Sequence, residues 1–501
     1  MSVHNRKIGA YTGILFIFIT AFVTMLICTK SSPLYPLNDW VDANTYLTIG
    51  RGMLHGKVPY RDLYEQKGPL LYMLHAGAAC ISDDSFLGVY IIESLACAVF
   101  LWETKYLMEI NGCEGKLWLL PLTALAVYSS EAFCHGDSAE ELCLPLTLGA
   151  YIIGYRAVTG MAGKDGRRAF VLGLLAGAVI WIKLTFLGVF AAAFIAVLAE
   201  CRRKHGEVLR TAALCVLGAF AASLPVVIYF GLNNALDDLF SVYFYDNIFR
   251  YSGDDRGLFH NIADGWNFSR IFMTVPFCII CAGIILIPLT KDRRRSIYYI
   301  GSVLLMFGTV FAGHGSYQYY PLAMAVFVPQ GVCLIINTVQ KLLKGRGVVL
   351  PKYTGAFLCA AALAADTALC YKLSRNVYLM KYDRSCLPQY HFAELMDGEG
   401  DMLNYGFIDG GFYLAAGEVP EYRYFCRNNM SVPEMTAAQE HYVSSHMPEY
   451  IVTRSDKKTP ERSFDGYTLV ATKGLSYYDK YFNYFLFRLN ENSDRRSFSI
   501  E

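Results

Sequence analysis

The chain contains 501 residues, of which 54% are apolar and only 17% are charged, and its mean hydropathy is +0.31. An average soluble domain carries about 25% charged residues, so this chain has too few charges to cover the surface of a soluble protein of its length. The net charge of +1 argues against a nucleic-acid-binding protein. The high apolar content excludes a disordered chain. The composition predicts a polytopic membrane protein.

Most of the 15 cysteines lie inside apolar runs, where a cysteine behaves as a small hydrophobic residue. Cys386 and Cys426 instead lie in the polar C-terminal segment. They could form a disulfide if that segment is outside the cytoplasm, and the sequence leaves this pairing open. The first apolar run, Ile8–Cys28, is longer than a signal-peptide core and lacks a small-residue cleavage site. We therefore expect it to be a retained membrane helix.

Apolar runs that could cross a bilayer occur along most of the chain, since a spanning helix needs about 20 residues. The eleven predicted spans are residues 8–29, 86–108, 117–133, 141–157, 169–182, 185–200, 209–231, 269–290, 297–313, 318–339 and 353–372. The fifth and sixth are short and meet at Trp181–Thr185. Read as one helix, they would form an unusually long span.

The charges of the loops support this count. With the N-terminus inside, the cytoplasmic loops are short and rich in Lys and Arg, as the positive-inside rule requires. These loops contain residues 156–168, 202–204, 291–295 and 341–346. Merging the fifth and sixth spans would place the later basic loops on the opposite side of the membrane.

This topology leaves residues 30–85, 232–268 and 373–501 outside the cytoplasm. The last segment contains strand-like runs separated by Gly and Pro. The predicted fold is an all-α polytopic membrane bundle of about eleven helices, with amphipathic helices in the first outer loop and a small C-terminal extracytoplasmic α/β domain. The predicted domains are residues 1–372 and 373–501.

The first outer loop is too long for a simple connector, and long ordered loops are usually functional. It contains Asp39 and Asp42, followed by apolar residues from Tyr46 to Leu54 at helical spacing. This pattern predicts a short amphipathic helix on the membrane surface. Asp42 could cap that helix or take a proton from a hydroxyl group, and the two roles are compatible.

Lys67 precedes Gly68 and Pro69, just before a second short helix. An ammonium group beside free backbone N–H groups at the bilayer surface suits a lipid phosphate. A solvated interfacial lysine is the alternative interpretation.

Carboxylates cluster between the third and fourth spans, at Asp137, Glu140 and Glu141. Three acids near lipid are costly unless they face water or a partner. The alternative is a helix start, with Asp137 or Ser138 as the cap and the two glutamates in the first turn. Lys183, between the fifth and sixth spans, requires an anion or water as its partner. Arg250 and Lys183 are further cations that could bind a donor phosphate.

The segment His314–Pro321 opens the tenth span and contains Gln318 and Tyr319. Tyrosines there could form an interfacial aromatic belt or platforms for sugar rings. The predicted topology places these residues at the same outer face as Asp42 and Lys67. That combination is typical of an interfacial enzyme that acts on an anionic lipid-linked substrate.

The chain resembles a membrane glycosyltransferase of the GT-C superfamily, in the bacterial branch related to protein O-mannosyltransferases and the lipid A aminoarabinose transferase. The motifs that carry the resemblance are Asp42–Tyr46 with His55–Asp62, Lys67–Tyr72, Gly136–Pro145, Gln318–Pro321 and the turn Lys183–Thr185. Together they cover roughly residues 1–340.

The resemblance implies transfer of a monosaccharide, with inversion, from a polyprenyl-phosphate donor to an envelope glycan, lipid or protein outside the bacterial cytoplasmic membrane. It assigns Asp42 to the catalytic acidic position and Lys67 to the donor phosphate. The residues expected to bind substrate are Asp39, Tyr46, Lys67, Asp137, Glu140, Glu141, Lys183, Arg250, Gln318 and Tyr319.

The chain departs from the family pattern at positions that bear on metal binding. Some relatives have a metal-binding acid where this chain has Gln66, and a histidine expected before the tyrosine pair is replaced by Gln318. The sequence therefore assigns no certain cofactor and leaves a divalent metal ion open.

Two other classes of protein compete with the enzyme. A transporter or flippase of lipid-linked glycans would have broken helices and charges deep in the bundle. A non-catalytic receptor would leave the Asp42 and Lys67 segments unexplained.

Overall fold

The computed structural model describes residues 3–161, 163–250, 257–313, 317–344, 354–396, 398, 400–430, 432–477 and 480–491. The chain divides into two compact units. The first, here called the helical unit, comprises Met1–Ser32, Tyr90–Val226 and Gly253–Tyr378. The second, here called the mixed unit, comprises Pro33–Val89, Val227–Ser252 and Leu379–Glu501. The sequence-based domain boundary at residues 372 and 373 stays a prediction.

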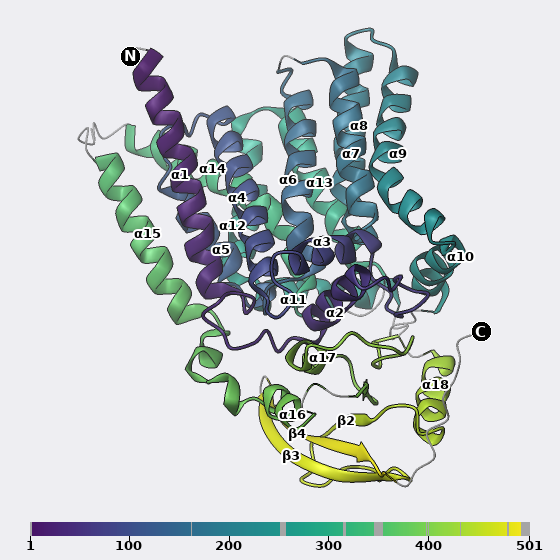
Figure 1. Cartoon of the computed structure of the whole chain (residues 1–501). Helices are drawn as coiled ribbons and strands as arrows, with labels where there is room; N and C mark the ends of the chain where they lie inside the picture. The colour runs from purple at the N-terminus through teal and green to yellow at the C-terminus, as the bar shows by residue number, and fades with distance from the viewer. Residues whose placement is uncertain are drawn as a thin grey trace. The chain divides into compact units, whose positions relative to one another are not determined.

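Long apolar helices make up the helical unit (Figure 1). They are α1 (Val3–Cys28), α4 (Leu87–Ile110), α5 (Leu119–Tyr128), α6 (Ala139–Val158), α7 (Asp165–Ile180), α8 (Leu187–Arg203), α9 (Val208–Leu232), α11 (Leu258–Phe272), α12 (Thr274–Leu286), α13 (Arg293–Phe311), α14 (Val328–Lys344) and α15 (Thr354–Leu373). Short helical turns accompany them at η1 (Glu131–Phe133), η2 (Leu184–Phe186), η4 (Ile287–Thr290) and η5 (Tyr320–Phe327). Each predicted span coincides with at least one of these helices.

Fewer helices than the eleven predicted spans are both long enough and apolar enough to cross a membrane. Among the described residues, 6 helices are long and apolar enough to cross a membrane, or up to 7 if the bent pair α11 and α12 forms one span. That pair bends by 113°. Helix α5 has 10 residues, and α6 begins with two glutamates, so neither matches the profile of an uninterrupted apolar span. The count of eleven stays a prediction.

Small residues allow the helices of this unit to pack closely. A Cβ atom on Gly173 of α7 would lie 1.9 Å from the carbonyl oxygen of Cys215 in α9. Backbone approach of this kind is the usual way in which membrane helices gain packing energy, because lipid supplies no hydrophobic drive between them.

The mixed unit combines helices with one small sheet. Its helices are α2 (Val41–Leu54), α3 (Pro69–Ala79), α10 (Leu236–Asp238), the π-helical segment η3 (Leu239–Arg250), α16 (Pro388–Met396), α17 (Phe412–Ala416) and α18 (Pro433–Ser444). The turns η6 (Val377–Lys381) and η7 (Arg384–Cys386) lead into it. Its strands are β1 (Met402–Asn404), β2 (Tyr450–Ser455), β3 (Tyr467–Tyr477) and β4 (Lys480–Leu489).

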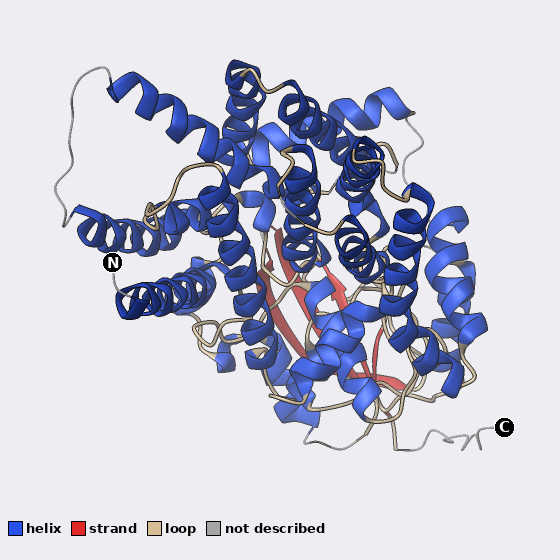
Figure 2. Cartoon of the chain, turned by 90° about the horizontal axis from the view of Figure 1, so that it is seen from above, coloured by secondary structure: helices blue, strands red, loops and turns tan. Residues whose placement is uncertain are grey.

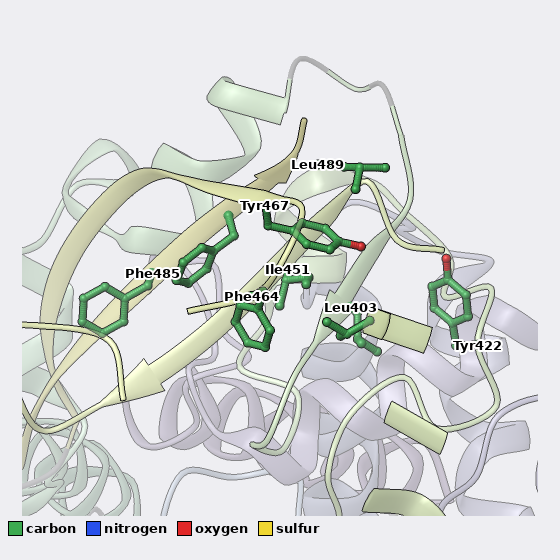
Figure 3. Packing of buried hydrophobic residues seen from close by; sticks show 9 residues of the cluster. Leu403, Tyr422, Ile451, Phe464, Tyr467, Phe485 and Leu489 are labelled. Carbon is green, nitrogen blue, oxygen red and sulfur yellow. The ribbon is translucent and has the colours of Figure 1, made fainter. Parts of the chain in front are cut away.

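The sheet has the strand order β1-β2-β4-β3, and Figure 2 shows its strands in red. Strand β1 is parallel to β2, whereas β2 and β3 are both antiparallel to β4. Alternate side chains of these strands, including Ile451, Phe485 and Phe487, pack with Leu403 and Phe464 in one buried cluster (Figure 3). The predicted strand-like runs of the tail therefore form the expected small sheet.

The burial of α2 differs from the prediction of a surface helix. All residues from Asp42 to Gly52 are buried. Thr48 donates a hydrogen bond of 2.6 Å to Asp409, and the Arg51 guanidinium donates to the carbonyl oxygen of Glu418 at 2.9 Å. The helix is covered on several sides because residues more than 350 positions later in the chain pack against it.

Candidate active site

Helix α2 places Asp42 and Tyr46 one turn apart, and the Tyr46 hydroxyl donates to Asp42 Oδ2 at 3.4 Å. The N-cap residue of α2 is Trp40, which makes no side-chain capping bond, and Asp42 is the second residue of the helix. The interpretation of Asp42 as the N-cap is therefore wrong. Its carboxylate still lies in the first turn, where the helix dipole favours a negative charge.

The amino group of Lys67 lies between two carboxylates, 3.9 Å from Asp42 Oδ2 and 3.7 Å from Glu65 Oε1. It also lies 5.8 Å from the ring centroid of Tyr46. Direct charge-assisted hydrogen bonds measure about 2.7–2.9 Å, so both ion pairs are longer than that. The Lys67 side chain is 18% exposed, and its ammonium group can reach an anion from outside.

Glu65 shapes the loop that carries Lys67, and sequence reasoning gave it no role. Its Oε2 atom accepts hydrogen bonds from the Lys67 backbone N–H at 2.8 Å and from the Tyr72 hydroxyl. Burial, followed by the charge of Glu65, raises the pKa of Tyr72 well above its ordinary value. Tyr72 therefore stays protonated and donates. The spacing of Glu65 from Lys67 was the available signal, but only the folded loop shows their contact.

Tyr60 supports the same loop from the other side. Its backbone has a φ of 72°, in the left-handed region that costs a non-glycine residue some conformational energy. In this conformation its hydroxyl donates to the carbonyl oxygen of Lys67 at 2.6 Å. Helix α3 begins immediately afterwards, with Gly68 as its N-cap and Pro69 as its first residue. The position of Lys67 is thus defined by bonds to its own backbone on both sides.

Helices α2 and α3 approach closely behind this cluster. A Cβ atom on Gly50 would lie 2.6 Å from the backbone nitrogen of Ala76, so a larger residue there would force the helices apart. The ring of His75 packs edge-on against Tyr46 at 5.5 Å, and its Nδ1 atom lies 2.8 Å from the Leu71 carbonyl oxygen. The close packing holds Asp42 and Lys67 in a fixed frame.

Asp39 and Arg250 belong to the same unit but have other neighbours. Asp39 precedes α2 and is buried. Burial raises the pKa of Tyr484; the positive charge of Arg454 opposes this rise, and the negative charge of Asp39 adds to it. Arg250 is 45% exposed and lies 3.4 Å from Asp246 and 3.6 Å from Glu434. These two carboxylates offset its charge.

Segment η3 is tied to the Lys67 loop. The Tyr64 hydroxyl donates to Asp246 at 2.8 Å, and Asn247 donates to the Gln66 carbonyl oxygen at 2.6 Å. Burial, with the hydrogen bond to Asp246, raises the pKa of Tyr64, so this tyrosine also remains a donor. The loop is therefore anchored by residues from a distant part of the sequence.

A second group of predicted residues belongs to the helical unit. The backbone N–H of Asp137 donates to Glu93 Oε1 at 2.6 Å and to Glu141 Oε2 at 2.9 Å. Thr29 donates to the other oxygen of Glu93 at 3.0 Å. Ser138 is the N-cap of α6, and its hydroxyl accepts from the Glu141 backbone N–H at 3.1 Å. The helix-start interpretation therefore describes the local structure of these acids.

Lys183 has the anion partner that the sequence required. Its amino group contacts Glu140, which is 2% exposed, and lies 4.2 Å from the ring centroid of Tyr320 and 5.5 Å from that of Tyr319. Gln318 donates to the Glu131 carbonyl oxygen at 3.1 Å. His314, the first residue of the same motif, lies outside the described residues. Lys183, Glu140 and the two tyrosines form one group within the helical unit.

A metal does not fit the side chains seen here. Among the described residues, no three His, Cys, Asp or Glu side chains converge in a way that could hold a metal ion. Asp42 and Glu65, two carboxylates beside Lys67, both form ion pairs with its ammonium group. No step of the mechanism below passes through a metal.

Comparison with solved structures identifies the architecture. A crystal structure of ArnT from Cupriavidus metallidurans bound to undecaprenyl phosphate matches with a TM-score of 0.60 and 11% identity, covering 94% of this chain and 97% of that chain. The apo state of the same protein matches with a TM-score of 0.57 and 12% identity, covering 89% and 93%. The chain has the ArnT fold.

ArnT is a lipid A aminoarabinose transferase of the GT-C type. The resemblance to GT-C membrane glycosyltransferases that the sequence motifs indicated is therefore confirmed at the level of the fold. No protein-family model matches the sequence, and no curated protein matches it. At 11% identity the likeness to ArnT establishes the architecture, and the activity has to be argued from the residues.

Proposed function

We propose that the chain is an inverting glycosyltransferase that moves a monosaccharide from a polyprenyl-phosphate donor to an envelope glycan, lipid or protein. The observation that carries this proposal is the pairing of Asp42 with Lys67 at 3.9 Å, in a chain with the ArnT fold. The proposed location is the bacterial cytoplasmic membrane, crossed several times, with the reaction and the C-terminal segment at its extracytoplasmic face.

In the proposed reaction, Asp42 is the general base. It takes the proton of the acceptor hydroxyl as that oxygen bonds to the anomeric carbon of the donor sugar. The bond between that carbon and the phosphate oxygen breaks on the opposite face, and the electron pair leaves with the polyprenyl phosphate. Since phosphate is already a good leaving group, the reaction needs one base and a cation for the departing charge.

Lys67 supplies that cation. Its ion pairs with Asp42 and Glu65 are long, so moving the ammonium group toward a phosphate oxygen breaks no short bond to either carboxylate. The move also takes a positive charge away from Asp42, so that its carboxylate can contact the acceptor hydroxyl. Binding of the donor therefore prepares the carboxylate for proton transfer.

The residues of the helical unit are proposed to bind substrate. Tyr319 offers an aromatic face to a sugar ring, and the Lys183–Glu140 pair offers both a cation and an anion to polar groups. We assign the same general role to Asp137, Glu141 and Gln318, and in the mixed unit to Asp39, Tyr46 and Arg250.

The test is an Asp42→Asn variant, assayed with a polyprenyl-phosphate sugar in lipid nanodiscs. The amide cannot accept a proton at neutral pH, so turnover should fall by about 10² or more, while the melting temperature stays near that of the parent. Glu421→Gln is the matched control, because Glu421 also pairs with a lysine of the mixed unit, Lys57, but is 58% exposed. Normal turnover in Asp42→Asn would remove this residue from the mechanism.

Transport of lipid-linked glycans is the second candidate function, because the helical unit has a broken helix and a buried charged residue, as a transporter would. Helices α11 and α12 form a broken pair bent by 113°. Asp366 is fully buried in α15, where it accepts a hydrogen bond from Thr24 of α1 at 2.8 Å. If purified protein moves a fluorescent lipid-linked sugar across proteoliposomes at the same rate with Asp42→Asn, transport is the better assignment.

A further inference from the structure

Helix α14 carries a polar stripe that the proposed reaction does not use. Gln330, Asn337 and Lys341 recur at helical spacing with Leu334 between them, so they share one face. The segment Tyr320–Leu343 is otherwise apolar enough to span a membrane. Polar groups on such a helix are costly unless they face protein partners or a polar ligand.

This stripe forms one wall of a cavity of about 580 Å³. The remaining walls come from the turn after α4, the end of α12 with η4, and the start of α13. Helices α12 and α14 pack against each other. The turn after α4, the end of α12 and the start of α13 are helix ends near the basic residues Arg293, Arg294 and Arg295, so we infer that the mouth of the cavity lies at headgroup depth.

The floor of the cavity is a fixed hydrogen-bond network. Gln330, which is 0% exposed, exchanges two hydrogen bonds of 3.3 Å with the Asn111 amide. The Tyr155 hydroxyl donates to Asn111 Oδ1 at 2.6 Å, and Asn337 donates to the Asn111 carbonyl oxygen at 2.8 Å. A network in which each amide is held by others has one arrangement, so the floor is pre-formed.

Two cations line this cavity. Arg295 has its guanidinium 5.8 Å from the ring centroid of Tyr155 and its Nε atom 2.8 Å from Asp292. Its terminal nitrogens make no hydrogen bond to the described residues, which leaves four N–H donors for a ligand. Lys341 makes no ion pair within the described part of the chain and is exposed at the mouth.

Apolar side chains line the rest of the cavity. Leu286, Leu289 and Leu342 stand beside the polar floor, and Leu289 and Leu342 are 66% and 71% exposed. A soluble anion would gain nothing from such walls, whereas the glycerol and first methylene groups of a lipid would bury them. The combination of a polar floor, two cations and apolar sides suits an amphiphile with a phosphate group.

We propose that this cavity binds the phosphate headgroup of an anionic glycerophospholipid from the surrounding leaflet, separately from the donor site at Asp42 and Lys67. The Arg295 guanidinium and the Lys341 ammonium contact the phosphate oxygens. Tyr155 and the Asn111–Gln330 pair form the floor beneath the headgroup. The lipid then links α12, α13 and α14 at the membrane surface.

The test measures binding of dihexanoyl phosphatidylglycerol to the purified full chain, with dihexanoyl phosphatidylcholine and inorganic phosphate as comparison probes. The double variant Arg295→Gln with Lys341→Gln should bind the anionic lipid at least about tenfold more weakly. The control double variant, Arg202→Gln with Arg293→Gln, removes the same charge from exposed positions outside the cavity. It should bind like the parent.

Three results would overturn the proposal. Equal binding by the cavity variant and the parent would show that these cations do not hold the lipid. Equal affinity of the parent for phosphatidylcholine would remove the need for a negative headgroup. Equal affinity for inorganic phosphate would make this a site for free anions. Turnover in the glycosyl-transfer assay serves as the check of folding, because both double variants leave the Asp42–Lys67 site unchanged.

Discussion

Replacement of Lys67 by alanine tests the electrostatics of the candidate site most directly. Its ammonium group lies 3.9 Å and 3.7 Å from the carboxylates of Asp42 and Glu65. Two unit charges about 4 Å apart interact by roughly 4 kcal/mol at an effective dielectric constant of about 20. The lysine therefore offsets two nearby negative charges. Without it, a phosphate at this position would be repelled by both carboxylates.

The expected loss can be estimated from the contact that Lys67 makes with the phosphate. A hydrogen bond to a charged group contributes about 1.5–3 kcal/mol, which corresponds to roughly 10- to 150-fold in affinity. Repulsion between the phosphate and the two carboxylates adds to the loss, so we expect Lys67→Ala to fall in the upper part of this range. Lys67→Arg keeps the charge and should recover part of the affinity.

The assay is a titration of undecaprenyl phosphate into nanodisc-embedded protein at two salt concentrations. Lys57→Ala is the control, since Lys57 pairs with Glu421 at 2.5 Å in an exposed part of the same unit. It should bind like the parent. If the titrations of Lys67→Ala and the parent coincide, Lys67 is a solvated lysine. Arg250 and Lys183 then become the candidate phosphate ligands, and the proposed coupling of donor binding to Asp42 is lost.

Three further predictions concern stability and topology. Burial raises the pKa of Glu418 to about 7, so the folded protein resists its ionisation. The free energy of unfolding should therefore fall as pH rises from about 4.5 to 7. In urea unfolding, the Glu418→Gln variant should show a flatter pH dependence and be about 3 kcal/mol more stable than the parent at pH 8. Parallel curves for variant and parent would contradict this prediction. Thr48→Val removes the 2.6 Å hydrogen bond to the buried Asp409. In the same measurement it should lower the free energy of unfolding by about 1–3 kcal/mol. An unchanged unfolding midpoint would mean that water replaces the hydroxyl group. A reporter that is active only outside the cytoplasm should be active after Asn376 and silent near Arg294, and the reverse pattern would rule out the predicted orientation.

Local patterns in the sequence located the helices and strands well. Each predicted span coincides with a helix, because an apolar run of sufficient length has few other structures open to it in lipid. The strand-like runs from Tyr450 and Tyr467 became β2 and β3 for a similar reason, since their alternation needs a sheet. The number of crossings stays a prediction, because the bend at Met273 and the short helix α5 depend on neighbouring helices.

The candidate site was only partly visible in the sequence. Asp42 and Lys67 stood out because a long polar loop is unusual in such an apolar chain, and the structure brings them within 3.9 Å. Glu65 and Tyr72 were missed because their contacts with Lys67 exist only once the loop has folded back. The roles assigned to Asp42 and Lys67 stay proposals.

The burial of α2 was unpredictable for a different reason. A short helix with mixed apolar and polar residues fits a membrane surface equally well, and no local feature marks Thr48 or Arg51 as interior residues. Their partners at Asp409 and Glu418 are supplied by the C-terminal segment. Polar residues that are buried by distant chain segments carry no periodic signal of their own.

The bond between Thr48 and Asp409 also sets an order of events during synthesis. The two residues are 361 positions apart, and a ribosome needs about 20–70 s to cover that distance at roughly 5–20 residues per second. Throughout that interval α2 has left the ribosome without the residues that will cover it. The mixed unit can therefore be completed only after translation, and its N-terminal part must wait in a partly exposed state. A nascent chain stalled before residue 409 should therefore expose α2 to protease.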